Sequence, residues 1–297
     1  MALVATLITN KSNPILSKSV VEKIMKAVNS TMFYWLANSI ACDIILDSEC
    51  IIDVCRQEIL SIIANKPIDL VIHRTENRRK RMLIADMDST MIQQECIDEL
   101  ADTIGIKEKV SSLTYLAMNG KIPFRDSIRE RVSLLKGISI QTVLSIIEKR
   151  ITYTPGGYEM VNTMKKNGAF TILVTGGFTV FADIISKKFG FDQYYANKLI
   201  DDNEKLTGKI LDPIIDGKEK SKILLKATKM LNISPEDSIA VGDGKNDIDM
   251  IKMAGYGVAF HAKPIVIKQS KIHINHSDLE SILYIQGYKQ HEIVKPM

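Results

Sequence analysis

The chain has 297 residues, of which 45% are hydrophobic and 25% are charged. This composition is typical of a globular protein, and the length is sufficient for one large domain or two. The formal net charge of +4 is too small to indicate a strongly acidic partner, so we expect no binding to nucleic acid. No apolar run approaches the roughly 18 residues that span a bilayer, so we expect neither membrane insertion nor an ion pump.

The cysteines favour a reducing compartment. Four are present, and none forms a Cys-x-x-Cys pair or accompanies a cluster of histidines. Reduced thiols are the rule in cytoplasmic proteins. The N-terminus also lacks the charged segment and long apolar stretch of a signal peptide. We therefore predict a cytoplasmic protein.

Residues 1–79 predict a small α+β domain. Apolar runs indicate four strands, which lie at Leu3–Ile8, twice within Phe33–Leu46 with a break near Asn38, and at Ile68–His73. Helical spacing of apolar residues indicates two helices, at Leu16–Val28 and Cys50–Ile63. The order β-α-β-β-α-β resembles a ferredoxin-like module of the ACT type, a kind of domain that commonly binds amino acids.

Two interpretations of this ACT-like domain stay open. One is a domain that binds a regulatory amino acid, and the other is a packing or dimerisation domain without a ligand. A homodimer formed through the N-terminal domain is our expectation for the second. The segment Glu76–Arg81 is strongly basic, and a charge run of this kind is most often a solvated linker. We predict that a second domain occupies residues 80–297.

The second domain is predicted to begin with a buried strand that ends in acidic residues. Met82–Ala85 is an apolar run, and Asp86, Asp88, Ser89 and Thr90 follow it. In open α/β sheets, ligands bind at the carboxyl ends of strands. Two neighbouring carboxylates repel each other unless a positive charge lies between them, and a hard divalent cation, most simply Mg²⁺, meets that need. The alternative is an acidic turn without function.

The chain then becomes helical, and later alternates between strands and helices. Four helices are predicted between about residues 95 and 150, at Ile97–Ile104, Lys107–Met118, Pro123–Leu135 and Ser139–Lys149. This insert is placed to cover the acidic strand end as a helical cap. Further helices are predicted at 158–167, 179–189, 218–231, 248–254, 265–270 and 278–285. Strands are predicted at 169–174, 238–241, 257–260 and 273–275, with a β-hairpin over Tyr194–Asp212. Such alternation predicts a doubly wound, mostly parallel sheet in an α/β domain.

Three predicted strands end in polar or glycine-rich turns, and their residues suit phosphoryl transfer. The turns begin at Asp86, at Thr175-Gly176-Gly177 and at Gly242-Asp243, and Lys220 lies on a helix between the last two. A carboxylate can attack phosphorus to form an acyl phosphate. A hydroxyl and backbone N–H groups bind phosphate oxygens, and a lysine neutralises charge in the transition state. A further carboxylate, Asp243, completes a cation site with Asp86.

These motifs identify the chain as a member of the haloacid dehalogenase superfamily. The series is Asp86-Met87-Asp88-Ser89-Thr90, Thr175-Gly176-Gly177-Phe178, Lys220 and Gly242-Asp243-Gly244-x-Asn246-Asp247. It covers roughly residues 82–285, and its order and spacing fit the phosphatases of that superfamily. The chain further resembles the phosphoserine phosphatase family through Glu95, Arg125-Asp126-Ser127, Arg129-Glu130-Arg131-Val132 and His261-Ala262-Lys263-Pro264.

The resemblance implies chemical roles at the first and last strand ends. It implies that Asp86 is the nucleophile, and that Asp88 is the general acid for the leaving oxygen and then the base for water. It implies that Asp86, the main-chain carbonyl of Asp88, and Asp243 bind Mg²⁺. Asp247 is expected to support the metal ligands.

The resemblance also implies a set of substrate contacts. The phosphate would contact Thr175, Gly176 and Lys220, and Asn246 would lie beside the substrate. The ammonium group would bind Glu95 and the carboxylate Arg131. Position 175 is usually serine in this family, and threonine keeps the hydroxyl but stiffens the side chain.

The residues alone leave several alternatives open. Without the resemblance, Arg129 competes with Arg131, and Lys218 and Lys222 compete with Lys220. Phe124, Met118 and Val132 are either lining of the cap or ordinary helix core, and His261 is interpreted as structural. The predicted reaction is hydrolysis of the small molecule O-phospho-L-serine to L-serine, the last step of serine synthesis. The alternatives are transfer of the phosphoryl group to another alcohol such as homoserine, and an amino-acid sensor in which residues 1–79 carry the main function.

Overall fold

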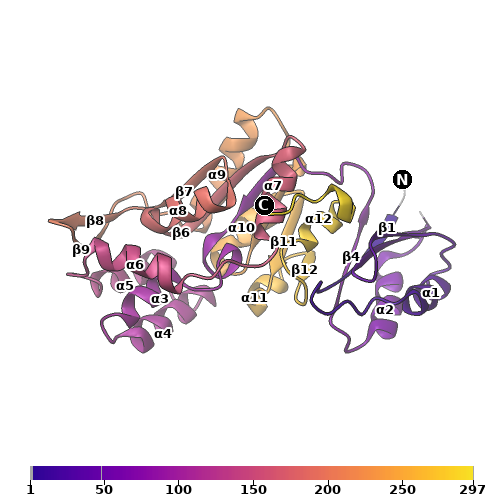
Figure 1. Ribbon diagram of the computed structural model, residues 1–297, viewed down its shortest axis with the longest axis horizontal. Coiled ribbons are helices and arrows are strands. Elements are labelled where there is room, and N and C mark those ends of the chain that lie inside the picture. Colours follow the sequence, from indigo (N-terminus) through magenta and orange to yellow (C-terminus); the bar gives the residue numbers. More distant parts are fainter. Residues whose placement is uncertain (1–2, 48, 297) are drawn as a thin grey trace.

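The computed structural model describes residues 3–47 and 49–296, which form two α/β units (Figure 1). The N-terminal unit has one four-stranded antiparallel sheet of order β2-β3-β1-β4. Its strands are β1 (Leu3–Thr9), β2 (Phe33–Ala37), β3 (Ala41–Leu46) and β4 (Ile68–Arg74). Its helices are α1 (Lys18–Ala27) and α2 (Ile52–Ile63). The β-α-β-β-α-β order and the ferredoxin-like arrangement predicted from the sequence are confirmed.

The two faces of the N-terminal sheet have different partners. On one face, residues such as Leu7 and Ile44 pack with Val21 and Ile24 of α1 and Ile59 of α2 in one apolar core. On the other face, a second set of strand residues joins the main apolar core of the second unit. These residues are Ile8, Leu36, Ala37, Ala41 and Val71. Because side chains alternate along a strand, one sheet can serve both cores.

The second unit contains a six-stranded parallel sheet of order β12-β11-β10-β5-β6-β7. The strands are β5 (Met82–Ala85), β6 (Phe170–Phe178), β7 (Gln193–Asn197), β10 (Ser238–Gly242), β11 (Tyr256–Phe260) and β12 (Ile272–Ile274). The associated helices are α7 (Gly157–Lys166), α8 (Thr179–Phe189), α9 (Gly217–Met230), α10 (Ile248–Met253), α11 (Pro264–Ile267) and α12 (Ser281–Ile285).

Helices cover both faces of this sheet, as the doubly wound prediction requires. Leu83 and Ala85 of β5 belong to an apolar core that also contains residues of α7, α8 and α12. Met82 and Ile84 point the other way and belong to a core with residues of α9 and α10. A strand buried on both faces has no polar positions, which explains the continuous apolar run in the sequence.

The helical insert is confirmed, and it has an addition that the sequence did not reveal. Its helices are α3 (Cys96–Asp102), α4 (Lys107–Met118), α5 (Phe124–Ser133) and α6 (Ile140–Arg150). The hairpin β8–β9 (Leu199–Asp202 and Lys205–Ile210) lies against them at the end of the molecule opposite the N-terminal unit (Figure 1). Backbone hydrogen bonds between Leu206 and the loop residues Gly137 and Ile138 join hairpin and cap.

Two predictions about strands were wrong. The segment Tyr194–Asp212 is not one hairpin, because its first part forms β7 and pairs in parallel with β6 after the crossover through α8. Only β8 and β9 form the hairpin. The predicted tight turn Thr175-Gly176-Gly177 is instead the extended end of β6, where the pairing with β7 shifts in register.

The prediction of a solvated basic linker was also wrong at two positions. Arg78 donates from Nη1 to Asp43 Oδ2 at 2.5 Å and from Nε to the carbonyl of Ile285 at 2.8 Å. It therefore joins β3 of the N-terminal unit to α12 of the second. Lys80 is buried, and its Nζ lies 4.1 Å from the centre of the Tyr256 ring. A charge run in sequence does not show which members find acids or aromatic rings in the fold.

Within the described residues, none of the helices combines the length and the apolar character needed to traverse a bilayer.

We predict that the Arg78–Asp43 pair stabilises the joint between the units. Asp43 is 5% exposed, so Arg78→Gln leaves a buried carboxylate without its cation, which costs about 3 kcal/mol or more. Arg79→Gln is the matched control, because Arg79 pairs with Glu292 at the surface and should cost about 1 kcal/mol or less. Urea unfolding measures both. An equal loss of unfolding free energy in the two variants would contradict the prediction.

Candidate functional site

The loop after β5 directs two carboxylates in different directions. The Asp86 N–H donates to the carbonyl of Val241 in β10, which fixes Asp86 at the end of the sheet. The irregular turn Met87–Met91 follows, and Ser89 within it has a positive φ of 56°. This conformation is uncommon for a residue other than glycine and is often found at functional sites. It turns the chain sharply between the sheet and the cap.

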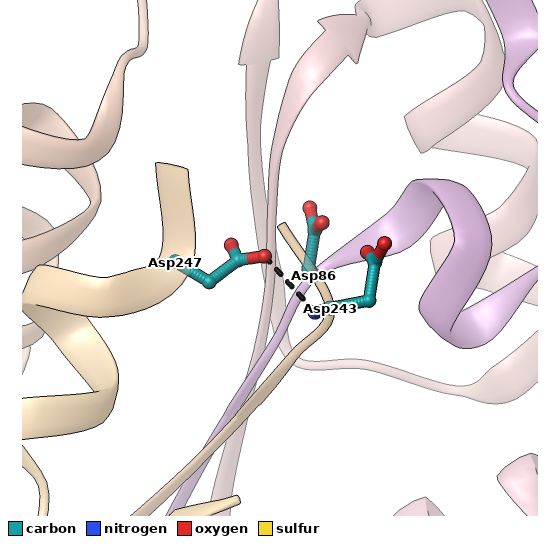
Figure 2. A group of neighbouring side chains, drawn as sticks. All are labelled: Asp86, Asp243 and Asp247. Atoms are coloured by element: carbon teal, nitrogen blue, oxygen red, sulfur yellow. Dashed lines mark hydrogen bonds between the residues drawn. The ribbon is translucent and has the colours of Figure 1, made fainter. Parts of the chain in front are cut away.

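Three buried carboxylates form a cluster at the carboxyl ends of β5 and β10. One oxygen from each of Asp86, Asp243 and Asp247 lies within 4.8 Å of the others (Figure 2). Asp247 comes from the turn before α10, and its Oδ2 accepts hydrogen bonds from the N–H groups of Asp243 at 3.1 Å and Gly244 at 2.9 Å. The dashed line in Figure 2 marks the first of these. The backbone thus holds the cluster in place.

Lys220 of α9 lies against this cluster and is fully buried. Its Nζ donates to Asp86 Oδ1 at 2.6 Å and to Asp247 Oδ1 at 2.7 Å. Burial alone would lower the pKa of Lys220, but the carboxylates of Asp247 and Asp86 raise it above its ordinary value. Lys220 therefore stays charged. Unlike Lys220, both Lys218 and Lys222 are exposed, and Lys222 pairs with Glu219 at the surface.

The cluster fits a divalent cation. Burial raises the pKa of Asp86 well above its ordinary value, with Asp247 adding to the effect and Lys220 opposing it. Burial and then Asp247 raise the pKa of Asp243 to about 7. Asp243 Oδ2 is buried without a hydrogen-bond partner, and Lys263 Nζ lies 3.7 Å away. Three acids and one buried lysine leave negative charge for a cation, and an all-oxygen donor set suits a hard one.

Asp88 lies apart from this cluster and faces the cap. Its Oδ1 accepts the N–H of Cys96 at 2.8 Å, and its Oδ2 accepts the hydroxyl of Thr175 at 3.0 Å. The Thr175 hydroxyl in turn accepts the N–H of Gly177 at 2.7 Å. The side chain of Asp88 is therefore held between the start of α3 and the end of β6. The sequence resemblance assigned the main-chain carbonyl of Asp88 to the metal site, and not its side chain.

A pocket between the cap and the sheet brings most of the predicted site residues together. Its lining includes Asp86, Asp88, Glu95, Arg131, Thr175, Gly176 and Asn246. Met118 and Phe124 of the cap also line it, which decides between the two interpretations left open for them. A Cβ at Gly176 would lie 2.5 Å from the far end of the Phe124 ring, so a side chain there would displace this ring. Lys220 is not part of the lining, because it lies behind Asp86.

The two charged cap residues differ in their surroundings. Glu95 is half-buried and accepts the Ser89 hydroxyl at 2.8 Å. Burial and the Asp88 carboxylate raise the pKa of Glu95 to about 8. Arg131 is 1% exposed, and its Nη2 is buried without a hydrogen-bond partner. Asn246 likewise has a buried oxygen without a partner. These free polar atoms are suited to a charged or polar ligand.

The structure also decides between the two arginines of α5. Arg129 is exposed and pairs with Asp212 beyond the hairpin, with Nη2–O distances of 2.7 and 2.9 Å. Arg131 faces the pocket. His261 lies outside the pocket lining and bonds through Nε2 with the carbonyl of Ser277, which agrees with its structural interpretation. Sequence reasoning missed the Ser89–Glu95 hydrogen bond, for which the sequence contains no signal beyond a serine in the first motif.

Comparisons with known proteins agree on one family. The profile of haloacid dehalogenase-like hydrolases matches residues 83–252. A probable phosphoserine phosphatase of Schizosaccharomyces pombe is 39% identical over 242 residues, covering 81% of this chain and 80% of that protein. A substrate-bound phosphoserine phosphatase structure has a TM-score of 0.67 at 42% identity, covering 69% of this chain and 97% of that one. A haloacid dehalogenase family hydrolase structure from Salmonella enterica serovar Typhi has a TM-score of 0.84 at 26% identity, covering 96% and 98%.

We predict that Asp243 destabilises the protein when divalent cations are removed. The folded form keeps a proton on Asp243 up to about pH 7, whereas the unfolded chain loses it near pH 4. The raised pKa of Asp243 therefore stabilises the folded form fully below about pH 4, and this stabilisation is lost as the pH rises towards 7. In EDTA, Asp243→Asn should raise the melting temperature at pH 8 and weaken its fall between pH 5 and 8.

The control for this prediction is Asp249→Asn, which removes an exposed acid from the same region. It should leave the melting temperature and its pH dependence nearly unchanged. If the melting temperature of Asp243→Asn is lower than that of the unsubstituted protein at pH 8 in EDTA, the charge of Asp243 does not destabilise the cluster, and the prediction is wrong.

Proposed function

This chain belongs to the haloacid dehalogenase-like hydrolase family, and we propose that it hydrolyses O-phospho-L-serine to L-serine and phosphate. The observation that carries this proposal is the pocket itself. Its sheet side presents Asp86, Thr175 and Gly176, while its cap side presents Glu95 and the unpaired Nη2 of Arg131. Phosphoserine has a phosphate at one end and an ammonium and a carboxylate at the other. The names of the relatives support the same substrate.

Asp86 acts as the nucleophile in this proposal. One carboxylate oxygen forms a bond to phosphorus as the bond between phosphorus and the serine oxygen breaks, which leaves an aspartyl phosphate. Water then attacks phosphorus, releases phosphate and restores Asp86. Lys220, which donates to Asp86 Oδ1, offsets negative charge beside the reacting atoms. Thr175 and the backbone N–H of Gly176 hold the phosphate oxygens in the first step and the second.

Asp88 carries the proton. It gives a proton to the serine oxygen as that oxygen leaves, and then takes one from the attacking water. Its two hydrogen bonds, from Cys96 and Thr175, fix its carboxyl group at the mouth between sheet and cap. Asn246 contributes its unpaired amide oxygen beside the substrate.

The cation is Mg²⁺ in this proposal. Asp86, the main-chain carbonyl of Asp88, and Asp243 would hold it, with Asp247 supporting the ligands. When bound, it would neutralise charge on the carboxylates and the phosphate. The all-oxygen donor set favours Mg²⁺ over zinc, which prefers nitrogen and sulfur.

The proposal extends to the organisation of the chain. Residues 1–79 form an ACT-like domain, and residues 80–297 form the phosphatase domain with its cap at about 95–150. Exposed apolar residues on the N-terminal domain support a homodimer formed through it, and they are Met32, Tyr34, Ile51, Ile52, Val54 and Leu60. The four cysteines are free thiols, which supports a cytoplasmic location.

A phosphate-release assay over phosphorylated amino acids and sugars, with Mg²⁺ present, tests the function. Phosphoserine should be the preferred substrate, and serine and phosphate should appear in equal amounts. The same assay with homoserine added separates hydrolysis from transfer. Formation of a phosphorylated acceptor in place of free phosphate would favour a phosphotransferase. No preference for phosphoserine would refute the proposal.

We predict that Asp88→Asn discriminates between leaving groups. The serine alkoxide needs a proton as it departs, and general acid catalysis is worth about 10²–10⁴ in rate. Asp88→Asn should lose about that factor on phosphoserine but much less on p-nitrophenyl phosphate, whose leaving group departs without a proton. Steady-state kinetics on both substrates measure the effect. Equal losses on the two would contradict the assigned role.

We predict that Arg131 reads the carboxylate of the substrate. Losing one partner of a desolvated charge pair costs about 2–5 kcal/mol, so Arg131→Ala should lower kcat/KM on phosphoserine by about 10²–10³. Phosphoethanolamine has no carboxylate and should be nearly unaffected. The matched control is Arg129→Ala, which removes an exposed arginine from the same helix and should be mild on both substrates. A selective loss in Arg129→Ala instead would reverse the assignment.

A further inference from the structure

We propose that Thr114 is a positioning residue, which aims the guanidinium group of Arg131 at the carboxylate of the substrate. The inference rests on the proposed function and deepens it. Thr114 lies on α4 and Arg131 on the neighbouring helix α5 of the cap. Thr114 is 5% exposed and does not line the pocket, so it acts through Arg131 and not on the substrate.

The guanidinium group of Arg131 is held at two of its three nitrogens. Nε donates to the carbonyl of Ser127, one turn earlier in α5, at 3.3 Å. Nη1 donates to the hydroxyl of Thr114 at 3.0 Å. Nη2 is buried and has no partner. Because the group is planar, fixing Nε and Nη1 also fixes the direction of Nη2, and Arg131 lines the pocket.

The hydroxyl of Thr114 also separates Arg131 from a nearby acid. It accepts from Arg131 and has two acceptors within hydrogen-bond distance, Asp98 Oδ1 of α3 at 2.8 Å and the carbonyl of Val110 at 3.1 Å, of which Asp98 is the nearer and the charged one. One hydroxyl therefore lies between a guanidinium group and a carboxylate. A direct pair between Arg131 and Asp98 would take donors that the substrate carboxylate needs. The arrangement keeps Asp98 satisfied and leaves Nη2 of Arg131 free.

Valine has nearly the shape of threonine but lacks the hydroxyl. In Thr114→Val, Nη1 of the buried Arg131 loses its partner, which is costly for a charged group, and Oδ1 of the partly buried Asp98 loses one of the partners of that carboxylate. Each can recover a partner by approaching the other, and this would rotate Nη2 of Arg131 away from the pocket. Thr114→Ser keeps the hydroxyl and removes only a methyl group. The two substitutions thus separate the hydrogen bond from packing.

The experiment compares phosphoserine with phosphoethanolamine as substrates of the full chain with Mg²⁺. Thr114→Val should lower kcat/KM on phosphoserine by about 10- to 100-fold, mostly through KM, because ground-state binding of the carboxylate is weakened. Its kcat/KM on phosphoethanolamine should change by no more than about twofold. Thr114→Ser should restore most of the activity on phosphoserine. Equal losses on both substrates in Thr114→Val would overturn the proposal, because they would indicate a purely structural role.

A second substitution tests the competing acid. Asp98→Asn combined with Thr114→Val removes the charge that would draw Arg131 away, so the double variant should regain part of the lost activity on phosphoserine. If the double variant is no more active on phosphoserine than Thr114→Val, Asp98 does not compete for Arg131, and the proposal is overturned. Thermal melting checks that each variant folds. If Thr114→Val does not fold, Thr114→Ser is compared with the double variant Asp98→Asn/Thr114→Ser. In that case, unchanged selectivity in Thr114→Ser and Asp98→Asn/Thr114→Ser supports the proposal, and a loss overturns it.

The unsubstituted protein separates this inference from the proposed function. If it does not prefer phosphoserine to phosphoethanolamine, the proposed function fails and Arg131 has no carboxylate to read. If it does prefer phosphoserine and Thr114→Val keeps that preference in full, only the role of Thr114 fails.

Discussion

The site depends on one buried cation, the ammonium group of Lys220. It is shared between Asp86 and Asp247, which come from different elements at the end of the sheet. Without it, three carboxylates would be buried together with little compensation, and burying unpaired charge is expensive. Lys220 does not contact Asp243, and that carboxylate has an unpartnered oxygen. The protein thus supplies one buried positive charge, with the partly exposed Lys263 3.7 Å from Asp243, and the remaining negative charge of the cluster suits a metal ion.

The cap adds a second set of charges that is separate from the first. Its helix α5 carries Phe124 over Gly176 and Arg131 into the pocket. The same helix is tied to the body of the protein by Arg125, which pairs with Asp216, the N-cap residue of α9. Because α9 carries Lys220, one ion pair links the helix that carries Arg131 to the helix that carries the partner of Asp86. This ion pair is thus one direct connection between the two sets of charges.

The sequence predicted the strand ends and motifs well because each is local. Asp86 and Asp243 follow buried strands and Thr175 lies near the end of a third, and parallel strands bring their carboxyl ends to one edge. The sequence could not choose between Arg129 and Arg131 from the residues alone, because the choice depends on which helix face meets the sheet. Nor could it place β7, since a strand at the edge of a sheet has the same polar composition as a hairpin. These decisions depend on contacts between distant segments, which no local pattern contains.

Two loops of the second unit connect the N-terminal unit to the site. Asp69 of β4 accepts the N–H groups of Asn275 at 2.8 Å and Ser277 at 2.9 Å, just after β12. The carbonyl of Ser277 bonds to the ring of His261, and the N–H of Lys263, two residues later, donates to the carbonyl of Asp243. Each of these hydrogen bonds has a backbone group as at least one partner, and the side chains that complete them are those of Asp69 and His261. The N-terminal unit is therefore linked to the backbone of Asp243 through residues 275–277 and then through residues 261–263, which gives a structural reason for the close packing of the two units.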